Sequence, residues 1–338
     1  MVKVGVIGLG MMGTTHLDVY NNRDDVEVVA VSDIDDDRLH GRTIAAGNVD
    51  GQAQGGFDFA SVKKYDEGKK LIRNKHIELV DVCLPTPLHM DFGRRVLKAG
   101  KHLMVEKPVA RTYREAKRFI DAAEKAERFS MVGQCIRFWP EWAWLKQAID
   151  EQRYGRVLAA HFRRVSQHPG APFYLDGEAC GGALLDLHVH DVDFIQYCFG
   201  LPKSVSSIGY SKQSGAIDHV LTRYDYEAIP VVVAEGGWAM ADGFGFCMQY
   251  SVNFERATVE YDMAGSPTLK VIEAGKPPEH PQVDSRMGYE LEIDYLLGCI
   301  KSGRRPENAT IASAAQAVKI AEAEAKSVQT GRSVKISA

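Results

Sequence analysis

A glycine-rich turn close to the first residue constrains the fold of this chain more than any other feature. Gly8, Gly10 and Gly13 form a G-x-G-x-x-G pattern that directly follows the β-branched run 2–8 and opens a helical segment reaching about Asn21. The first glycine permits a tight turn, the second lets the backbone approach a pyrophosphate, and the third lets helix pack on strand. The sequence therefore predicts a dinucleotide-binding βαβ unit.

An acidic residue at the expected distance strengthens this interpretation. Asp33 ends the next apolar run, 26–33, and lies 20 residues after Gly13. A carboxylate there bonds the adenosine ribose hydroxyls and repels a 2′-phosphate, so NAD is favoured over NADP. Arg38 follows five residues later and keeps NADP as the less favoured alternative. A tight turn without a ligand is the alternative for the glycine pattern. The other residues expected beside the cofactor here are Met11, Met12 and Ile34.

Short apolar runs alternate with helical patterns over the first part of the chain, which predicts an α/β fold with a parallel sheet. The segment 45–60 is rich in Gly, Gln and Asp and is expected to be a surface loop. We predict a Rossmann domain over 1–135. The runs interpreted as strands are 2–8, 26–33, 77–85, 102–108 and 129–135.

The pattern changes after Pro140, where consecutive strand-like stretches joined by short turns replace the alternation. Such stretches favour a second sheet, antiparallel or mixed, that is separate from the first. We predict a second domain over 136–338. Its strands are expected in 157–165 and 203–273, and its helices at 141–152, 288–302 and 310–329.

Composition and charge indicate which partners and which compartment to expect. The chain has 338 residues and a formal net charge of −4, with no apolar run near the ~20 residues that span a bilayer. We expect neither nucleic acid nor a membrane as a partner. The six cysteines are spread widely without a C-x-x-C pair. They predict reduced thiols in a cytoplasmic protein, without a disulfide framework or a metal site.

The tripeptide Glu106-Lys107-Pro108 follows the apolar run that begins at 102. A strand of such a sheet ends in the ligand crevice at its carboxyl edge. A lysine at this place can hydrogen-bond a substrate oxygen and stabilise alkoxide character during hydride transfer. An exposed loop lysine without a role in chemistry is the alternative.

Asp186 and His190 lie four residues apart in the apolar stretch 181–199, which is predicted to be a buried helix. Residues at this spacing share a helix face, and Asp193 shares it too. A neutral imidazole can take a proton near pH 7, and a nearby carboxylate can orient it and raise its pKa. A satisfied His–Asp pair in the core is the alternative. His188 is rotated away and is assigned to packing or surface.

Several motifs occur together in a specific order and spacing. They are the glycine turn with His16, Cys83-Leu-Pro85-Thr86-Pro87-x-His89, Glu106-Lys107-Pro108, Arg137-Phe138-x-Pro140, Gly181-Gly182-x-x-x-Asp186-x-x-x-His190-x-x-Asp193 and Gly303-Arg-Arg-Pro306. The set resembles the glucose–fructose oxidoreductase / inositol dehydrogenase family over essentially the whole chain. The resemblance implies a Rossmann domain followed by an α/β domain with a large, open-faced, mostly antiparallel sheet. It also implies homodimers or homotetramers that pack through that sheet.

The resemblance assigns roles to individual residues. It implies that Lys107 contacts substrate near the nicotinamide, that His190 is the general acid and base, and that Asp186 binds substrate. It also implies a set of residues on the nicotinamide side. These are Pro85, Thr86 and His89, with Glu106 close by.

Residues and resemblance together predict an NAD-dependent dehydrogenase that oxidises a secondary alcohol of a sugar, polyol or sugar derivative without a metal. One alternative is a glycosidase or epimerase that uses NAD transiently, and another is a non-catalytic regulator that responds to a nucleotide. Arg163, Arg164 and His168 would suit an acidic substrate group such as a uronate, with surface salt bridges as the alternative. The candidate substrate contacts are Arg137, Arg163, His168, Asp186 and Tyr289.

Overall fold

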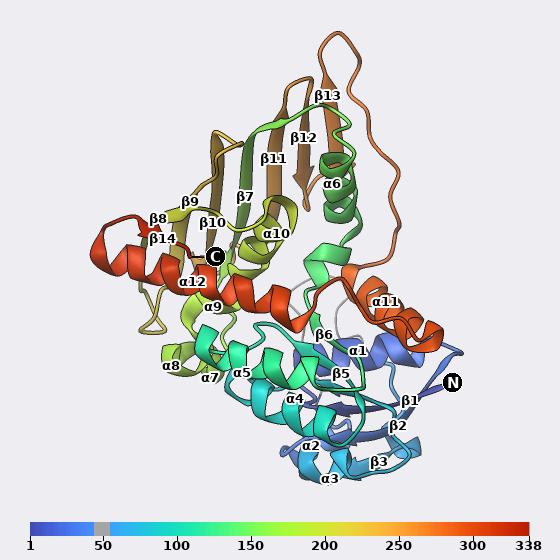
Figure 1. Ribbon diagram of the computed structural model, residues 1–338. Helices are drawn as coiled ribbons and strands as arrows, with labels where there is room; N and C mark the ends of the chain where they lie inside the picture. The colour runs from blue at the N-terminus through green and yellow to red at the C-terminus, as the bar shows by residue number, and fades with distance from the viewer. Residues whose placement is uncertain (44–54, 338) are drawn as a thin grey trace. The chain divides into compact units, whose positions relative to one another are not determined.

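The computed structural model describes residues 1–43 and 55–337 (Figure 1), so most of the predicted loop at 45–60 lies outside the described residues. The chain forms two compact units. The first comprises Met1–Cys135 and Gly288–Ala315, and the second comprises Ile136–Met287 and Gln316–Ala338. Residues 288–315, assigned from the sequence to the second domain, therefore pack with the first. None of the described helices is both long and apolar enough to cross a membrane.

The first unit contains a six-stranded sheet in the order β3-β2-β1-β4-β5-β6, and every neighbouring pair is parallel. This is the strand order of a dinucleotide-binding Rossmann fold, with its switch point between β1 and β4. The strands are β1 (Val2–Ile7), β2 (Val26–Ser32), β3 (Lys63–Tyr65), β4 (Leu79–Val82), β5 (His102–Glu106) and β6 (Ser130–Gly133). Strand β3 was not expected from the sequence, because its three largely polar residues show no alternation.

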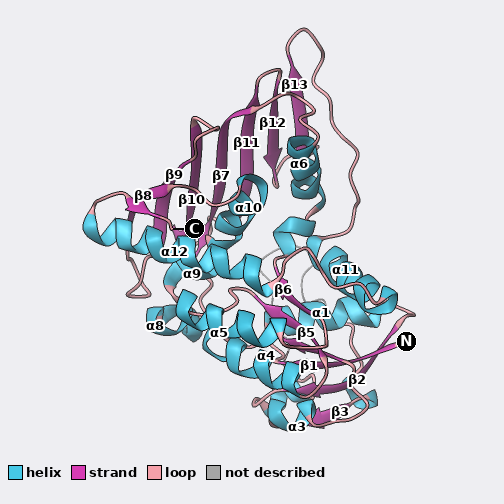
Figure 2. Ribbon diagram, in the orientation of Figure 1, coloured by secondary structure: helices cyan, strands magenta, loops and turns pink. Residues whose placement is uncertain are grey.

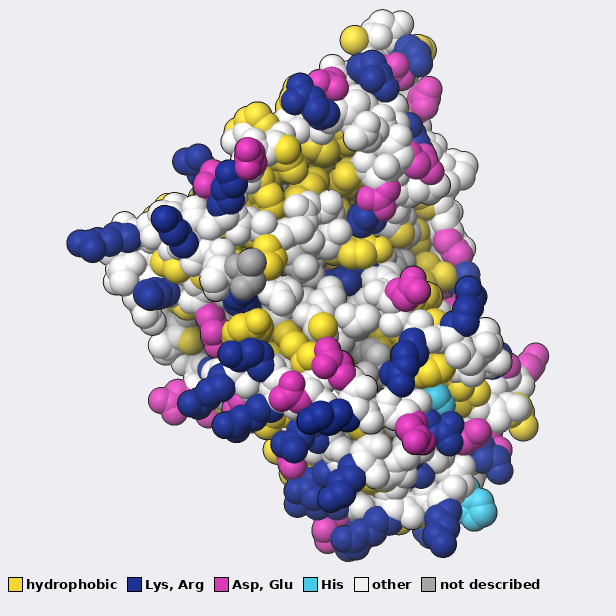
Figure 3. Space-filling model, in the orientation of Figure 1, with side chains coloured by type: hydrophobic (Ala, Val, Ile, Leu, Met, Phe, Trp, Pro, Cys, Tyr) yellow, Lys and Arg dark blue, Asp and Glu magenta, His cyan; other side chains and the backbone are white. Residues whose placement is uncertain are grey.

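Helices cover this sheet on both faces. Helix α1 packs against α11, while α4 packs against α3 and α5. Figure 3 shows Lys and Arg side chains, with Asp and Glu among them, gathered over the layer of α4 and α5. Helix α5 begins at a capping box, in which Thr112 and Glu115 bond each other's backbone. The helices are α1 (Met11–Asn21), α2 (Asp36–Leu39), α3 (Gly68–Ile72), α4 (His89–Lys98), α5 (Tyr113–Glu124) and α11 (Gly288–Ser302).

The second unit contains an eight-stranded sheet in the order β13-β12-β11-β7-β10-β9-β8-β14 (Figure 2). Only β7 and β10 pair in parallel, so the predicted mostly antiparallel sheet is confirmed. The strands are β7 (Val157–Gln167), β8 (Ser204–Tyr210), β9 (His219–Asp225), β10 (Val231–Met240), β11 (Phe246–Phe254), β12 (Ala257–Asp262), β13 (Leu269–Glu273) and β14 (Val334–Lys335). The two-residue β14 was not expected from the sequence.

Helices pack on one face of this sheet and leave the other face open. Alternate residues point to opposite faces, and β9 and β12 show a strict alternation of buried and less buried positions. Helices α9 and α10 pack on the face that holds the core. The other face carries exposed apolar side chains, so the predicted open face is confirmed. The remaining helices are α6 (Pro140–Asp150), α7 (Pro172–Leu175), α8 (Gly177–Cys180), α9 (Gly182–Asp186), α10 (Val189–Phe199) and α12 (Ile311–Thr330).

Candidate active site

The glycine turn between β1 and α1 has the geometry that its sequence requires. Gly8 has a φ of +92°, which favours glycine. A Cβ on Gly13 would lie 1.8 Å from the carbonyl oxygen of Gly8, so only glycine allows this close packing of helix and strand. A Cβ on Gly10 would meet nothing within 4 Å, so its backbone faces open space. No side chain caps the start of α1. The residues therefore fit a pyrophosphate at this helix N-terminus.

Asp33, the residue predicted to bind the adenosine ribose, lies at the end of β2. The carboxylate accepts hydrogen bonds from the N–H groups of Leu9, at 2.6 Å, and Asp35, at 2.9 Å. These bonds hold the side chain still and leave lone pairs for ribose hydroxyls. Ile34 is 94% exposed beside it, an apolar surface suited to an adenine ring. Arg38 pairs with the carboxylate of Asp35 at 3.8 Å.

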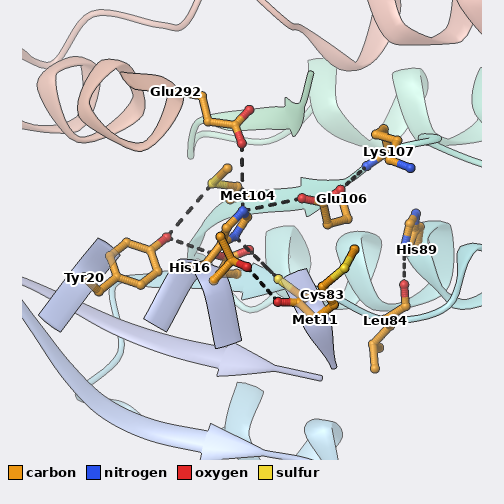
Figure 4. Close-up of polar contacts among 12 residues, drawn as sticks. Met11, His16, Tyr20, Cys83, Leu84, His89, Met104, Glu106, Lys107 and Glu292 are labelled. Atoms are coloured by element: carbon orange, nitrogen blue, oxygen red, sulfur yellow. Dashed lines mark hydrogen bonds and ion pairs between the residues drawn. The ribbon is translucent and has the colours of Figure 1, made fainter. Parts of the chain in front are cut away.

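His89 contacts both the loop after β4 and the loop after β5 through its two ring nitrogens. Its Nδ1 lies 2.7 Å from the carbonyl oxygen of Pro108, and its Nε2 lies 2.5 Å from that of Leu84 (Figure 4). His89 is buried and bridges the two loops, and its predicted place beside the cofactor stays a prediction. Thr86 is buried at the start of a short helical turn, and Pro85 before it is exposed.

A buried cluster lies beneath the carboxyl ends of β4 and β5 (Figure 4). His16 of α1 binds Asp81 of β4, with 2.8 Å between Nδ1 and Oδ2. The Tyr20 hydroxyl donates to the same oxygen at 2.9 Å. Burial alone would lower the pKa of His16, but Asp81 and then Glu106 raise it above its ordinary value. Asp81 and Glu106 therefore favour the protonated imidazole, against the effect of burial.

Two glutamates complete this cluster. Nε2 of His16 lies 3.5 Å from Oε1 of Glu106, at the end of β5, and 3.8 Å from Oε1 of Glu292 in α11. The backbone N–H of Lys107 donates to Glu106 at 3.1 Å. Burial, and then the charges of Glu106 and Asp81, raise the pKa of Glu292 well above its ordinary value. Glu292 was not among the residues expected from the sequence. Its only signal is an acidic residue on the buried side of 288–302.

His16 is also shared by two groups of potential metal-binding side chains. One adds Asp81 and Cys83, and the other adds Glu106 and Glu292. Within each group the nitrogen, oxygen or sulfur atoms lie within 4.8 Å of one another. The absence of a metal stays a prediction, and metal analysis of the purified protein tests it.

The second unit holds Asp186 and His190 on two helices instead of one. Asp186 is the last residue of α9, and His190 is the second residue of α10. Both side chains are half-buried. His188, between them, is fully buried. Its Nε2 lies 3.2 Å from the Tyr224 hydroxyl and 3.5 Å from a carboxylate oxygen of Glu324.

Two buried ion pairs hold helix α10 near its start, one at Asp191 and one at Asp193. Arg137 binds Asp193 with two bonds of 2.6 Å, and Arg164 of β7 binds Asp191 with bonds of 2.8 and 3.2 Å. Such paired geometry fixes orientation as well as contact. Arg137, predicted to contact substrate, is therefore engaged in holding the helix that carries His190.

The other candidate substrate residues are dispersed. Arg163 lies on the open face of the second sheet and binds Glu235 at 2.9 Å, a salt bridge of the kind given as its alternative. Its neighbour Arg164 points to the opposite, covered face. His168 follows β7 and packs edge-on against Trp238, with ring centroids 5.6 Å apart. Tyr289 is buried in α11 of the first unit.

Two segments of this chain match models of known protein families. Residues 2–134 match the oxidoreductase family with an NAD-binding Rossmann fold, and residues 142–260 match the GFO/IDH/MocA C-terminal domain. The chain belongs to the GFO/IDH/MocA family of oxidoreductases. The family and the Rossmann NAD-binding domain expected from the sequence are confirmed.

Curated relatives and solved structures agree with this placement. Inositol 2-dehydrogenase from Salmonella paratyphi B is 27% identical over 342 aligned residues, covering 98% of this chain and 95% of the relative. Levoglucosan dehydrogenase from Pseudarthrobacter phenanthrenivorans is 28% identical, covering 61% of this chain and 53% of the relative. A structure of levoglucosan dehydrogenase with NADH and levoglucosan has a TM-score of 0.85 over 100% of both chains at 19% identity, which shows a shared fold.

Proposed function

We propose that this family member is an NAD-dependent dehydrogenase that oxidises a secondary alcohol of a sugar, polyol or sugar derivative. One observation carries the proposal. On the 182–199 stretch, Asp186 and His190 stay half-buried, while the neighbouring Asp191, Asp193 and His188 are buried. Buried ionisable groups are paired for stability, whereas ionisable groups kept accessible in an otherwise apolar segment point to chemistry. The similarity to an inositol 2-dehydrogenase supports the substrate class.

Alcohol oxidation requires a hydride acceptor, a hydrogen-bond donor to the substrate oxygen and a base, and the cofactor and this chain supply all three in the proposal. NAD supplies the hydride acceptor when bound at the glycine turn. Lys107, directly after β5, donates a hydrogen bond to the substrate oxygen and stabilises its developing negative charge. His190 takes the hydroxyl proton, and Asp186 binds and orients the substrate beside it. Pro85, Thr86 and Glu106 line the nicotinamide side in this proposal.

We also propose that the protein works in the cytoplasm as a homodimer or homotetramer joined through the open face of the second sheet. Exposed apolar side chains on β8, β9, β10 and β13 support this assembly, because monomers rarely expose such a surface. These side chains are Ile208, Tyr210, Leu221, Val231 and Ile272.

A substrate panel tests the catalytic proposal directly. Inositols, aldoses, uronates and amino sugars are incubated with NAD and the purified protein, and NADH formation is followed by its absorbance. The proposal predicts NADH formation with at least one cyclic polyol or sugar. Turnover of a glycoside or epimerisable sugar without net NADH, by a protein that retains NAD through purification, would favour transient cofactor use instead. Binding of nucleotide without any turnover would favour a regulator.

A further inference from the structure

The break between α9 and α10 carries both Asp186 and His190, and His188 lies midway between them in the sequence. The backbone of His188 takes part in both helices. Its N–H donates to the carbonyl oxygen of Ala183 at 2.8 Å, and its own carbonyl oxygen accepts from the N–H of Asp191 at 3.0 Å. A shift of His188 would therefore move both Asp186 and His190.

The side chain of His188 belongs to a buried polar cluster within the second unit. His188 and Glu324 are fully buried, and Tyr224 is 2% exposed. Nε2 of His188 lies 3.2 Å from the Tyr224 hydroxyl on β9 and 3.5 Å from Oε1 of Glu324 in α12. A Cβ on Gly236 of β10 would meet the same ring. Segments far apart in the sequence thus enclose the imidazole.

The contacts of Nε2 determine how the ring of His188 is oriented. Its Nδ1 has no hydrogen-bond partner among the described residues. Burial, and then the charge of Glu324, raise the pKa of Tyr224 well above its ordinary value, so the hydroxyl keeps its proton and can donate. Burying polar groups costs free energy that an apolar side chain at position 188 would not cost. Polar groups kept in the core in this way can specify one arrangement of the segment that carries them.

We propose that His188 is a positioning residue, and that the Tyr224–His188–Glu324 cluster fixes Asp186 and His190 relative to each other. The inference rests on the proposed function, which assigns substrate binding to Asp186 and proton transfer to His190. Because His188 is fully buried, it acts through the backbone of the α9–α10 break and not by contact with the substrate. A misplacement of about 1 Å at a reacting group can slow a reaction by about a hundredfold.

Steady-state kinetics on a substrate that yields NADH test this proposal. His188→Leu removes the polar contacts and is expected to lower kcat by about tenfold to a hundredfold and to raise KM for the alcohol. The Kd for NADH is expected to stay unchanged. His188→Gln, whose amide nitrogen can take the place of Nε2, is expected to recover most of the kcat. Tyr224→Phe removes one partner of the ring and is expected to lower kcat by a smaller factor than His188→Leu.

A double variant and a matched control separate positioning from a general loss of stability. His188→Leu combined with Tyr224→Phe is expected to lose no more kcat than His188→Leu alone, because the two residues act through one contact. Thr222→Val is the control. Its buried hydroxyl, also on β9, lies 2.7 Å from Oγ of Ser207. We expect this control to lose stability as Tyr224→Phe does and to keep the wild-type kcat and KM.

Two results would overturn the positioning role and leave the proposed function standing. One is wild-type kcat and KM in His188→Leu and Tyr224→Phe, and the other is an equal loss of kcat in Thr222→Val. If His188→Leu does not fold, Tyr224→Phe decides the question, because it removes a single hydroxyl. A wild-type protein that binds NADH but oxidises no alcohol would overturn the proposed function, and this inference with it.

Discussion

At the scale of single residues, we propose that Asp33 holds the cofactor by its adenosine ribose and sets the preference for NAD. Its carboxylate is already anchored by the N–H groups of Leu9 and Asp35. Ribose hydroxyls therefore meet a fixed acceptor, while a 2′-phosphate would meet a fixed negative charge. Arg38, the residue that kept NADP as an alternative, pairs with Asp35 instead.

Replacing Asp33 tests this account. Asp33→Ser removes the charged acceptor, and hydrogen bonds to charged groups contribute about 1.5–3 kcal/mol. We expect the Kd for NAD to rise by about tenfold to a hundredfold, and the preference over NADP to shrink. NADH and NADPH fluorescence titrations measure both, with the exposed Asp24→Asn as the control. Unchanged affinity for NADH in Asp33→Ser would contradict the assignment.

Asp218 is a second residue whose environment determines a measurable property. It accepts hydrogen bonds from the N–H groups of Lys212, Gln213 and Ser214 at 2.7, 2.7 and 3.0 Å, and from the indole of Trp238 at 2.8 Å. Burial would raise its pKa, but the N–H and hydroxyl donors outweigh burial and lower the pKa to about 2.

This lowered pKa predicts acid sensitivity. The native state favours ionised Asp218, so its contribution to stability is present above the unfolded pKa of about 3.9 and is lost as pH falls towards about 2. We expect Asp218→Asn to lose about 2 kcal/mol of the free energy of unfolding at pH 7 and to weaken the stability loss between these pH values. Urea denaturation across that range checks this. An equal pH slope in variant and wild type would count against it.

Sequence patterns predict residues such as Asp33, because a motif defines their spacing. They do not predict the role of Asp218, which combines a nearby loop with a residue of another strand, or of Glu292, whose partners come from distant segments. Asp218 gathers donors from one loop and from Trp238 on β10, while Glu292 meets His16 and Glu106 across the sheet. Long-range packing of this kind leaves no local pattern.

At the scale of elements, α10 shows how buried charges orient a helix. Arg137 and Arg164 each bind a carboxylate of α10 on either side of Val192. The apolar pattern of 181–199 predicted one helix, but the chain breaks between α9 and α10 at Leu187 and His188. Gly236 lies directly against this break. A Cβ on Gly236 would lie 2.3 Å from Nδ1 of His188, so only glycine leaves room for the imidazole.

The Arg164–Asp191 pair gives a double-mutant test at this scale. Arg164→Met leaves Asp191 buried without a partner, which typically costs about 3–5 kcal/mol of stability. The double variant Arg164→Met with Asp191→Leu removes both charges and is expected to recover most of that loss. Chemical denaturation of the four proteins in the cycle measures it. If Arg164→Met and the double variant lose the same free energy of unfolding, the two charges do not stabilise each other as a buried pair.

At the scale of the whole molecule, the open sheet face is the surface that an isolated chain would leave exposed. Strand alternation predicted a second sheet, and the resemblance implied which face stays open. The grouping of 288–315 with the first unit could not be predicted from the sequence, because the apolar stripe of α11 suits either unit.

A charge on that face is expected to dissociate the proposed homodimer or homotetramer. A lysine at Leu221, which pairs with Ile208 across β9 and β8, would place a charge within the apolar surface. We expect Leu221→Lys to halve the molar mass measured by light scattering after size-exclusion chromatography, with the cofactor affinity per chain retained. Leu175→Lys, an exposed apolar position on α7, is the control. An unchanged mass in Leu221→Lys would place the interface elsewhere.

In the proposed reaction, Lys107 and His190 perform the chemistry on a cofactor held by other residues. On a substrate that yields NADH, the most direct measurement is kcat for Lys107→Ala and His190→Ala, paired with the Kd for NADH from fluorescence. Loss of a positioned acid–base group typically slows turnover by about 10²–10⁴-fold. We predict a loss of that order in both variants, with NADH affinity little changed. Substantial turnover in both variants would contradict the account.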